Sequence, residues 1–256
     1  MKLRVLGCHG GLAPGLHTTC YLLSDEIAID AGALSHRLEV PALEKIRDIF
    51  LSHAHHDHVA SLPSLVEYRI GGSGEPIRLH GLAETLEALR CHLFNDVLWP
   101  DFASIPGRHG PVIEYAPLTP GEIVRVGPLG LTAIPMQHTV PCVGYLVTHA
   151  LASPPRSILV GSDTASLDTV VEASRRARGL RFLMVEVSFP DRLEALARES
   201  GHLCPSMLAS SLQALPDGLP IYVTHLKPEV AGEVTAELAA LPRKITRLEQ
   251  DMELSW

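Results

Sequence analysis

Residues 53–58 read HAHHDH and place four histidines and one aspartate within six positions. Imidazole nitrogens and carboxylate oxygens are ligands that Zn²⁺ prefers in proteins, at roughly 2.0–2.2 Å. Side chains alternate sides along an extended segment, so His53 and His55 can point the same way while Asp57 and His58 turn toward a second position. The alternative is a solvated histidine-rich loop, but this spacing favours a metal site.

Three further residues of the same types each follow a predicted strand: His138, Asp163 and His225. Taken singly, a histidine or aspartate at a strand end is more often a helix cap or a loop residue. Histidine is also abundant in the whole chain, at 14 of 256 residues, which is more than a core needs. The sequence therefore makes these three residues candidates for the same chemistry.

The elements that must position these residues follow from hydrophobic periodicity. Strands are predicted at Leu3–Leu6, Cys20–Leu23, Ile27–Ile29, Ile49–Ser52, Ile77–Leu79, Val112–Tyr115, Ile123–Val126, Leu131–Met136, Val143–Thr148, Ser157–Val160, Phe182–Val187 and Ile221–Thr224. Helices are predicted at Pro41–Ile46, Val59–Arg69, Leu82–Phe94, Leu167–Ala177, Arg192–Glu199, Ser206–Leu215 and Pro228–Leu238. The histidine cluster then lies on a strand-to-helix loop. Strands that first follow one another and later alternate with helices predict an α/β (α+β) fold, an αββα four-layer sandwich.

Length and composition limit the class of protein. The chain has 46% hydrophobic and 20% charged residues and shows no repeat or low-complexity segment, so we predict a single domain over residues 1–256. The formal net charge is -8, with 29 acidic and 21 basic residues. Such a surface does not suit a long nucleic-acid duplex, whose binding needs clustered cations. Nucleic acid is therefore not the expected partner.

The N-terminal segment and the cysteines bear on the compartment. Residues 1–11 lack the apolar run of a secretory signal, and no stretch approaches 18 apolar residues, so we expect no membrane span. The five cysteines are scattered, and no C-x-x-C occurs. Reduced thiols in a cytoplasmic protein are the simplest interpretation.

The string His53-x-His55-x-Asp57-His58 resembles the signature of the metallo-β-lactamase superfamily. The resemblance implies the αββα fold, two divalent metal ions and, usually, hydrolysis. It also implies three groups of ligands: His53, His55 and His138 for one ion, Asp57, His58 and His225 for the other, and Asp163 as a bridge beside a hydroxide. Zn²⁺ is the expected metal, and Mn²⁺ or Fe²⁺ accept the same ligands.

The charge of such a site bears on its substrate. Two divalent cations, two aspartates and a hydroxide leave about +1, which attracts a phosphodiester monoanion despite the acidic surface. Metal binding also lowers the pKa of water to about 7 and so supplies hydroxide at neutral pH.

Two later segments resemble elements of ribonuclease Z and its relatives. Residues 183–189 contain Glu186 in a Glu-x-x-Phe pattern, and residues 200–203 contain His202. The resemblance implies that His202, held by Glu186, protonates the leaving oxygen, and we count Asp57 with them as catalytic. The alternatives are a solvent-facing helix end for His202 and a strand-end salt bridge for Glu186.

Six segments also resemble class II 3′,5′-cyclic-nucleotide phosphodiesterases: Gly7–Gly11, Ile29–Gly32, Asn95–Phe102, Glu186–Pro190, Ser200–Leu203 and Thr224–Pro228. We therefore predict a metal-dependent phosphodiesterase that converts cAMP or cGMP to the 5′-nucleotide, with a homodimer implied by resemblance alone. Trp99 and Phe102 are candidates to stack on the base, and a core or subunit-contact role for Trp99 is the alternative.

Three other functions are weighed against this prediction. Ribonuclease Z holds tRNA with a long arm, usually between the third histidine and the bridging aspartate. Here His138 and Asp163 are 25 positions apart with no basic insert, so tRNA 3′ processing is the alternative function. Thioester or lactone hydrolysis would not need the Glu186–His202 pair. A non-catalytic scaffold would be expected to lack ligands, and all seven are present.

Overall fold

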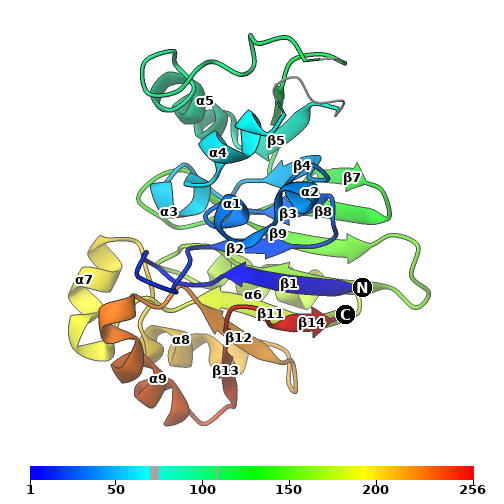
Figure 1. Cartoon of the computed structure of the whole chain (residues 1–256). Helices are drawn as coiled ribbons and strands as arrows, with labels where there is room; N and C mark the ends of the chain where they lie inside the picture. Colours follow the sequence, from blue (N-terminus) through cyan, green and yellow to red (C-terminus); the bar gives the residue numbers. More distant parts are fainter. Residues whose placement is uncertain (70–74, 108) are drawn as a thin grey trace. The chain divides into compact units, whose positions relative to one another are not determined.

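The computed structural model describes residues 1–69, 75–107 and 109–256, which divide into two compact units (Figure 1). Unit 1 comprises residues 1–7, 17–118 and 250–255, within the described ranges. Unit 2 comprises residues 8–16, 119–249 and Trp256. This division does not test whether the chain behaves as one domain in solution, so a single domain over 1–256 stays a prediction.

Unit 1 is built on a seven-stranded sheet in the order β14-β1-β2-β3-β4-β5-β6. Its strands are β1 (Lys2–Gly7), β2 (Cys20–Leu22), β3 (Ile27–Ile29), β4 (Asp48–Phe50), β5 (Ile77–Gly81), β6 (Ile113–Pro117) and β14 (Glu253–Ser255). Its helices are α1 (Leu34–Arg37), α2 (Val40–Leu43), α3 (His56–Val59), α4 (Leu62–Glu67) and α5 (Ala83–His92), the last of which contacts β5 and β6. The strands β14 to β3 pair antiparallel, and β3 to β6 pair parallel.

Unit 2 contains a second seven-stranded sheet, in the order β13-β12-β11-β10-β9-β8-β7. Its strands are β7 (Ile123–Val126), β8 (Leu129–Met136), β9 (Cys142–His149), β10 (Arg156–Val160), β11 (Leu180–Glu186), β12 (Ile221–Thr224) and β13 (Ile245–Arg247). Its α-helices are α6 (Asp168–Arg176), α7 (Glu194–Glu199), α8 (Pro205–Ser211) and α9 (Ala231–Ala239). Three 3₁₀ turns adjoin them: η1 (Asp191–Leu193), η2 (Leu212–Ala214) and η3 (Pro228–Val230).

Both sheets share one pairing pattern, in which three antiparallel pairs are followed by three parallel pairs. The pattern changes at β3 in unit 1 and at β10 in unit 2. In α/β sheets, functional groups gather at the carboxyl ends of strands near such a change. Asp30 follows β3, residues 53–58 follow β4, and Asp163, Glu186 and His225 lie at the ends of β10, β11 and β12.

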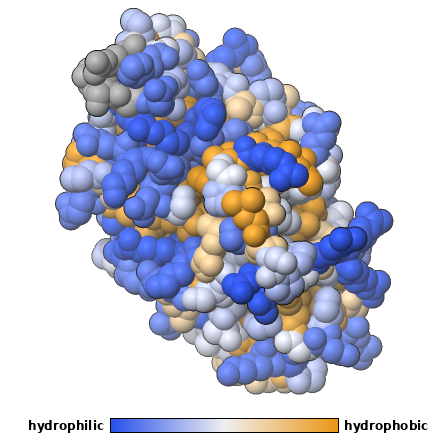
Figure 2. Space-filling view, turned by 90° about the vertical axis from the view of Figure 1, so that its right-hand side faces the viewer, coloured by the Kyte–Doolittle hydropathy of each residue, from blue (hydrophilic) through white to orange (hydrophobic). Residues whose placement is uncertain are grey.

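Each unit has its own hydrophobic core. In unit 1, Ile49, Leu79 and Ile113 of the parallel strands are buried together with the apolar residues of α4 and α5. In unit 2, the buried side chains of β11 and β12 join those of α6, α8 and α9. The face drawn in Figure 2 is mostly hydrophilic, with hydrophobic patches between the polar residues. The burial of these strands explains why their sequences read as continuous apolar runs.

The predicted strands are present with shifts of one or a few residues at their ends, and the predicted helix Pro41–Ile46 corresponds to α2. The short helix α1 was not predicted, and one predicted helix was wrong. The predicted helix Val59–Arg69 is two helices, α3 and α4. Pro63 stands in the first turn of α4, where its ring and missing N–H prevent one helix from running through. As α3 begins at His56, Asp57 and His58 lie on a helical turn and not on a loop.

The structure also bears on the cysteines and on the length of the helices. No disulfide joins the five cysteines, all of which lie in the described ranges. Among the helices of residues 1–69, 75–107 and 109–256, none combines the length and apolar character required to cross a membrane.

A polar cluster fixes the register of the parallel strands in unit 1. Asp48 of β4 is 1% exposed and accepts hydrogen bonds from Arg78 Nε and Nη2, each at 2.8 Å, and from His80 Nε2 at 2.7 Å. Burial by itself would raise the pKa of Asp48, but the bonds from His80 and Arg78 outweigh it and hold this pKa below its ordinary value. The His80 ring stacks on Phe50, with centroids 4.3 Å apart.

We expect Asp48→Asn to lower the free energy of unfolding by about 2 kcal/mol at pH 7, because hydrogen bonds to a buried charge are lost. A lowered pKa contributes stability above the ordinary carboxyl pKa and loses it as pH falls through the folded-state value. Urea denaturation at pH 7 and near pH 3 should therefore show a difference that narrows in acid. Asp25→Asn is the control, since its exposed partner is Lys45 at 3.3 Å. An equal effect of both variants would contradict this account.

Candidate metal centre

The end of β4 carries an ordered group of polar residues in unit 1. Asp30 Oδ1 accepts a hydrogen bond from the Ser52 N–H at 2.7 Å, and Asp30 Oδ2 accepts one from Ser52 Oγ at 2.8 Å. His53 and His58 are fully buried, and His58 Nδ1 lies 2.7 Å from Asp30 Oδ2. These bonds attach the histidine segment to the end of the neighbouring strand β3.

The turn after β3 brings α3 to this place. Asp30 has φ 55, in the left-handed region, and the Ala31 N–H donates to the His58 carbonyl at 2.7 Å. Gly32 has no room for a side chain, because an added Cβ would lie 2.2 Å from the Asp57 carbonyl oxygen. The chain therefore passes directly against the backbone of α3, which requires glycine at this position.

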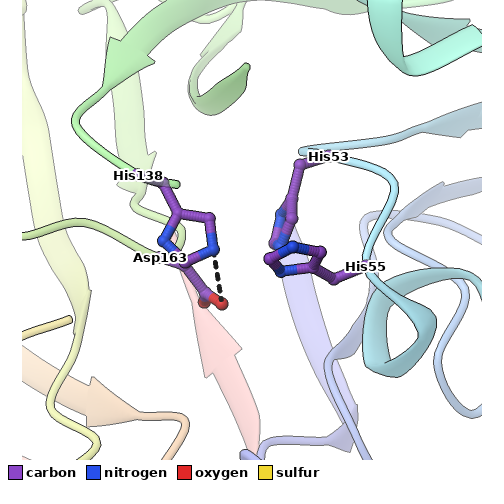
Figure 3. A group of neighbouring side chains, drawn as sticks. All are labelled: His53, His55, His138 and Asp163. Carbon is purple, nitrogen blue, oxygen red and sulfur yellow. Dashed lines mark ion pairs between the residues drawn. The ribbon is translucent and has the colours of Figure 1, made fainter. Parts of the chain in front are cut away.

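Figure 3 shows the first two histidines of the segment side by side. The rings of His53 and His55 lie edge to face, with centroids 4.6 Å apart. The next two predicted ligands also lie near each other, as His58 Nε2 is 3.9 Å from Asp57 Oδ2. Unit 1 thus brings together its four predicted ligands within one short segment.

Unit 2 brings together its three predicted ligands from three strand ends. His138 follows β8, Asp163 follows β10 and His225 follows β12. His138 Nε2 is 3.9 Å from Asp163 Oδ2, as the dashed line in Figure 3 marks, and His225 Nε2 is 3.5 Å from Asp163 Oδ1. Both distances exceed an ordinary hydrogen bond. Two ligand atoms that share one tetrahedral zinc ion are about 3.4 Å apart, so this spacing fits donors of a metal centre.

A hydrogen bond at Nδ1 fixes the orientation of the His138 ring. Its Nδ1 lies 2.8 Å from the carbonyl oxygen of Gly201, which turns Nε2 toward Asp163. Burial lowers the pKa of His138 below its ordinary value, although the Asp163 carboxylate opposes this shift. The neutral imidazole that results is the form that binds metal ions.

Glu186 and His202 form a buried pair in the same unit. His202 Nδ1 lies 3.0 Å from Glu186 Oε1, which also accepts hydrogen bonds from the Thr164 N–H at 3.2 Å and the Leu203 N–H at 3.1 Å. Burial by itself would lower the pKa of His202, but the Glu186 charge and hydrogen bond raise it above its ordinary value. His202 is buried and does not face solvent, and Glu186 forms an ion pair with it at the end of β11.

His202 also lies beside the predicted ligands. One donor atom each of Asp163, His202 and His225 lie within 4.8 Å of one another, and the rings of His202 and His225 stack with centroids 5.4 Å apart. The Phe189 ring contacts His202 edge to face, with centroids 5.8 Å apart. The pattern Glu186-x-x-Phe189 therefore holds both a carboxylate and an aromatic ring against one imidazole.

The predicted ligands of each unit are of types that fit divalent metal ions. Unit 1 supplies three imidazoles and one carboxylate, and unit 2 supplies two imidazoles and one carboxylate, which zinc and related ions accept. The carboxylates supply negative charge, and hydrogen bonds at Nδ1 orient His58, His138 and His225. The residues of each unit are thus suited to hold metal ions, and the roles of the individual ligands stay predictions.

The two aromatic candidates lie in different surroundings within unit 1. Phe102 is 1% exposed and packs in the core, edge to face with Phe94 at 6.2 Å between centroids. A ring buried in this way offers no face to a nucleobase, so the structure does not support a stacking role for Phe102. Trp99 is partly buried against the same core and pairs with Phe94 through a backbone bridge. Its role in the substrate pocket stays a prediction.

Sequence reasoning did not assign roles to several residues that organise the centre. They are Asp30, Ser52, Ser188 and Gly201. For Asp30, Ser52 and Ser188 the signal in the sequence was a polar residue directly after, or next to, a buried strand, and for Gly201 it was a glycine after a helix. Serine in such a place is common in ordinary turns, so this signal alone could not identify them.

Gly201→Ala should disturb His138 in addition to straining the backbone. Gly201 has φ 74, and an added Cβ would lie 2.7 Å from His138 Nδ1. Gly218 has φ 66 and no atom within 4 Å of an added Cβ, so Gly218→Ala reports the backbone strain alone, about 1 kcal/mol. We expect Gly201→Ala to lower the free energy of unfolding further and to weaken Zn²⁺ binding, measured by chelator competition. Equal Zn²⁺ affinity in both variants would show that His138 had not moved.

A comparison with protein families gives one match that covers most of the chain. The family described as "Beta-lactamase superfamily domain" matches residues 27–239. A "Probable 3′,5′-cyclic-nucleotide phosphodiesterase" of Yersinia pestis is 25% identical over 276 residues, covering 87% of this chain and 77% of the relative. A "Ribonuclease Z" of Bradyrhizobium sp. (strain ORS 278) is 25% identical over 252 residues, covering 80% of each.

Solved structures provide the comparison for the fold. Unliganded yeast PDE1 superimposes with a TM-score of 0.83, covering 98% of each chain at 18% sequence identity. Together with the two seven-stranded sheets and their helices, this likeness confirms the predicted fold.

Proposed function

Because the chain belongs to the metallo-β-lactamase superfamily, we propose that it is a metal-dependent phosphodiesterase that hydrolyses 3′,5′-cyclic nucleotides to 5′-nucleotides. The seven predicted ligands would act together and hold two divalent cations, with Zn²⁺ as the first choice and Mn²⁺ or Fe²⁺ as alternatives. Their proposed distribution is His53, His55 and His138 on one ion, Asp57, His58 and His225 on the other, and Asp163 on both.

The Glu186–His202 pair is the observation that carries this proposal. A buried imidazole bonded to a carboxylate through Nδ1 directs its Nε2 away from that carboxylate. It lies next to Asp163, which the proposal makes the bridge, and to His225, which it makes a ligand of the second ion. A proton donor placed beside a metal centre suits the cleavage of a phosphodiester, whose leaving oxygen must be protonated. Lactone and thioester hydrolysis have less need of it.

The residues of the candidate site have distinct parts in the proposed reaction. When bound, the two cations neutralise phosphate charge and lower the pKa of water, which supplies the nucleophile at neutral pH. His202 donates a proton to the departing 3′ oxygen. Glu186 fixes the ring of His202 and the loop that carries Asp163, since Glu186 Oε1 accepts from the Thr164 N–H. Asp57 and the other ligands would hold the cations where these can bind the cyclic phosphate.

The small cyclic nucleotide is favoured over tRNA by what lies between His138 and Asp163. In the structure β9, β10 and their short connections occupy these positions, and no long basic arm is inserted. A tRNA would require many phosphate contacts, which a chain of net charge -8 supplies poorly. The similarity to the Yersinia pestis relative extends over 87% of the chain. A cytoplasmic location and a homodimer also belong to this proposal.

Product analysis tests the function directly. We expect the purified protein to convert cyclic AMP or cyclic GMP to the 5′-nucleotide, with chelation abolishing turnover and Zn²⁺ or Mn²⁺ restoring it. Bis(p-nitrophenyl) phosphate and precursor tRNA serve as parallel substrates, with Asp163→Ala as the inactive control that also loses metal. Cleavage of precursor tRNA alone would instead assign the ribonuclease Z activity. Full zinc occupancy of Asp163→Ala would refute the bridging role.

His202→Ala should lower kcat by about 10²–10⁴-fold, the usual contribution of general acid catalysis, while keeping both metal ions. Steady-state kinetics with the cyclic nucleotide and metal analysis of the same preparation check the two halves of this expectation. A leaving group that needs no proton, such as p-nitrophenolate, should reduce the effect of the substitution. Unchanged turnover of the cyclic nucleotide would remove His202 from the reaction.

A further inference from the structure

Two buried serines lie at the centre of the hydrogen bonds that orient the predicted ligands. Ser188 follows β11 in unit 2 and Ser52 follows β4 in unit 1, and both have almost no exposed surface. Each hydroxyl contacts a buried carboxylate and two imidazoles.

In unit 2, the protons around Ser188 can be assigned from the distances. Ser188 Oγ lies 2.9 Å from Glu186 Oε2, 3.1 Å from the His225 carbonyl oxygen and 2.9 Å from His225 Nδ1. A hydroxyl has a single hydrogen, and the nearer, charged carboxylate is the stronger acceptor. Ser188 therefore donates to Glu186. Its oxygen can then only accept from His225 Nδ1, which must carry a proton.

The same carboxylate fixes the second imidazole of this group. Glu186 Oε1 accepts from His202 Nδ1 at 3.0 Å, while Ser188 Oγ is more distant from that atom, at 3.3 Å. Both rings thus have their Nδ1–H directed to the Glu186–Ser188 pair. Because a neutral imidazole has one N–H, this assignment leaves Nε2 of His225 with its lone pair as the donor for a metal ion.

Unit 1 repeats the arrangement with different residues. Ser52 Oγ donates to Asp30 Oδ2 at 2.8 Å and lies 3.0 Å from His53 Nδ1. Asp30 Oδ2 also accepts from His58 Nδ1 at 2.7 Å. The two rings again have their Nδ1–H on a serine–carboxylate pair. In each unit a serine hydroxyl bonded to one carboxylate forms, together with that carboxylate, the acceptors for the Nδ1–H groups of two histidines.

We propose that Ser52 and Ser188 are positioning residues that fix the Nδ1–H tautomer of His53 and His225 and so prepare Nε2 of each ring to bind a metal ion. This inference rests on the proposed metal centre and adds to it the residues that set ligand orientation. The hydroxyl is required because it donates and accepts at once, which a methyl group cannot do. Hydrogen-bonded groups behind a histidine ligand typically affect metal affinity by about 10–100-fold.

The two substitutions should differ in how many metal ions they affect. His225 is assigned to one ion, so Ser188→Ala should weaken one Zn²⁺ by about 10–100-fold and leave the other near its original affinity. Ser52 contacts His53 and also lies 3.2 Å from His58 Nδ1, and these two are assigned to different ions. Ser52→Ala should therefore weaken both. Competition with a chromophoric chelator measures the two affinities.

Matched variants separate positioning from folding. Ser157→Ala removes the hydroxyl of a buried serine that donates to the Arg178 carbonyl, at 3.0 Å, so it reports the general effect of losing a buried serine hydroxyl. Ser52→Thr and Ser188→Thr keep a hydroxyl and should restore much of the affinity. The zinc-loaded proteins with ¹⁵N-labelled histidine provide a second measurement, because the Nδ1–H signals of His53 and His225 should be lost or exchange faster only in the alanine variants.

Failure of the proposed role of the serines can be distinguished from failure of the proposed function. If the wild-type chain binds two Zn²⁺ and hydrolyses the substrate while both alanine variants keep their affinities and Nδ1–H signals, the role of the serines is wrong and the function stands. A wild-type chain that binds no Zn²⁺ overturns both. A loss in Ser157→Ala equal to that in Ser188→Ala would assign the effect to general destabilisation and overturn the positioning role.

Discussion

The structure depends on the burial of two carboxylates, Asp30 and Glu186, among imidazoles. A charged group removed from water is stable only where several hydrogen bonds replace its hydration. Glu186 accepts bonds from two backbone N–H groups, a hydroxyl and an imidazole, and Asp30 accepts from the Ser52 N–H, the Ser52 hydroxyl and His58. Satisfying these carboxylates determines where the surrounding loops run and which ring nitrogens carry protons.

The sheets make this possible because parallel strands end together. Backbone N–H groups just beyond such ends are not used by the ladder and can bond a side chain from the neighbouring strand. The turns that follow must be sharp, and two non-glycine residues accept the left-handed region there: Asp30 with φ 55 and His225 with φ 65. Each is held by its own backbone bond, from the Asp30 N–H to the Phe50 carbonyl at 3.0 Å and from the His225 N–H to the Cys8 carbonyl at 2.8 Å. Two of the four described non-glycine residues in the left-handed region thus belong to the candidate centre.

Sequence alone predicted much of this fold because several strands, such as β4, β10 and β11, are almost wholly buried and read as apolar runs. The strands it missed, β13 (Ile245–Arg247) and β14 (Glu253–Ser255), are three residues long and partly polar, so they have no such signal. Residues 53–58 could be identified because five donors within six positions are rare. His138, Asp163 and His225 could be assigned as ligands only through the resemblance. They are far apart in the sequence, and it is the folded sheet that brings the ends of β8, β10 and β12 near one another. Ser52 and Ser188 were not predicted because a hydroxyl becomes informative only when its neighbours are known.

The contrast between His138 and His202 shows how the chain gives two buried imidazoles of one unit opposite properties. Both rings are removed from water, which by itself lowers the pKa of each. The Nδ1 of His138 bonds a neutral acceptor, the Gly201 carbonyl, so burial prevails and the ring favours its neutral form. The Nδ1 of His202 bonds the charged Glu186, which outweighs burial and favours the protonated form. A ligand must be neutral and a proton donor must be charged, so the partner at Nδ1 suits each ring to its proposed part. The sequence places Gly201 and His202 next to each other, and one turn of chain therefore supplies both the carbonyl for one ring and the second ring itself.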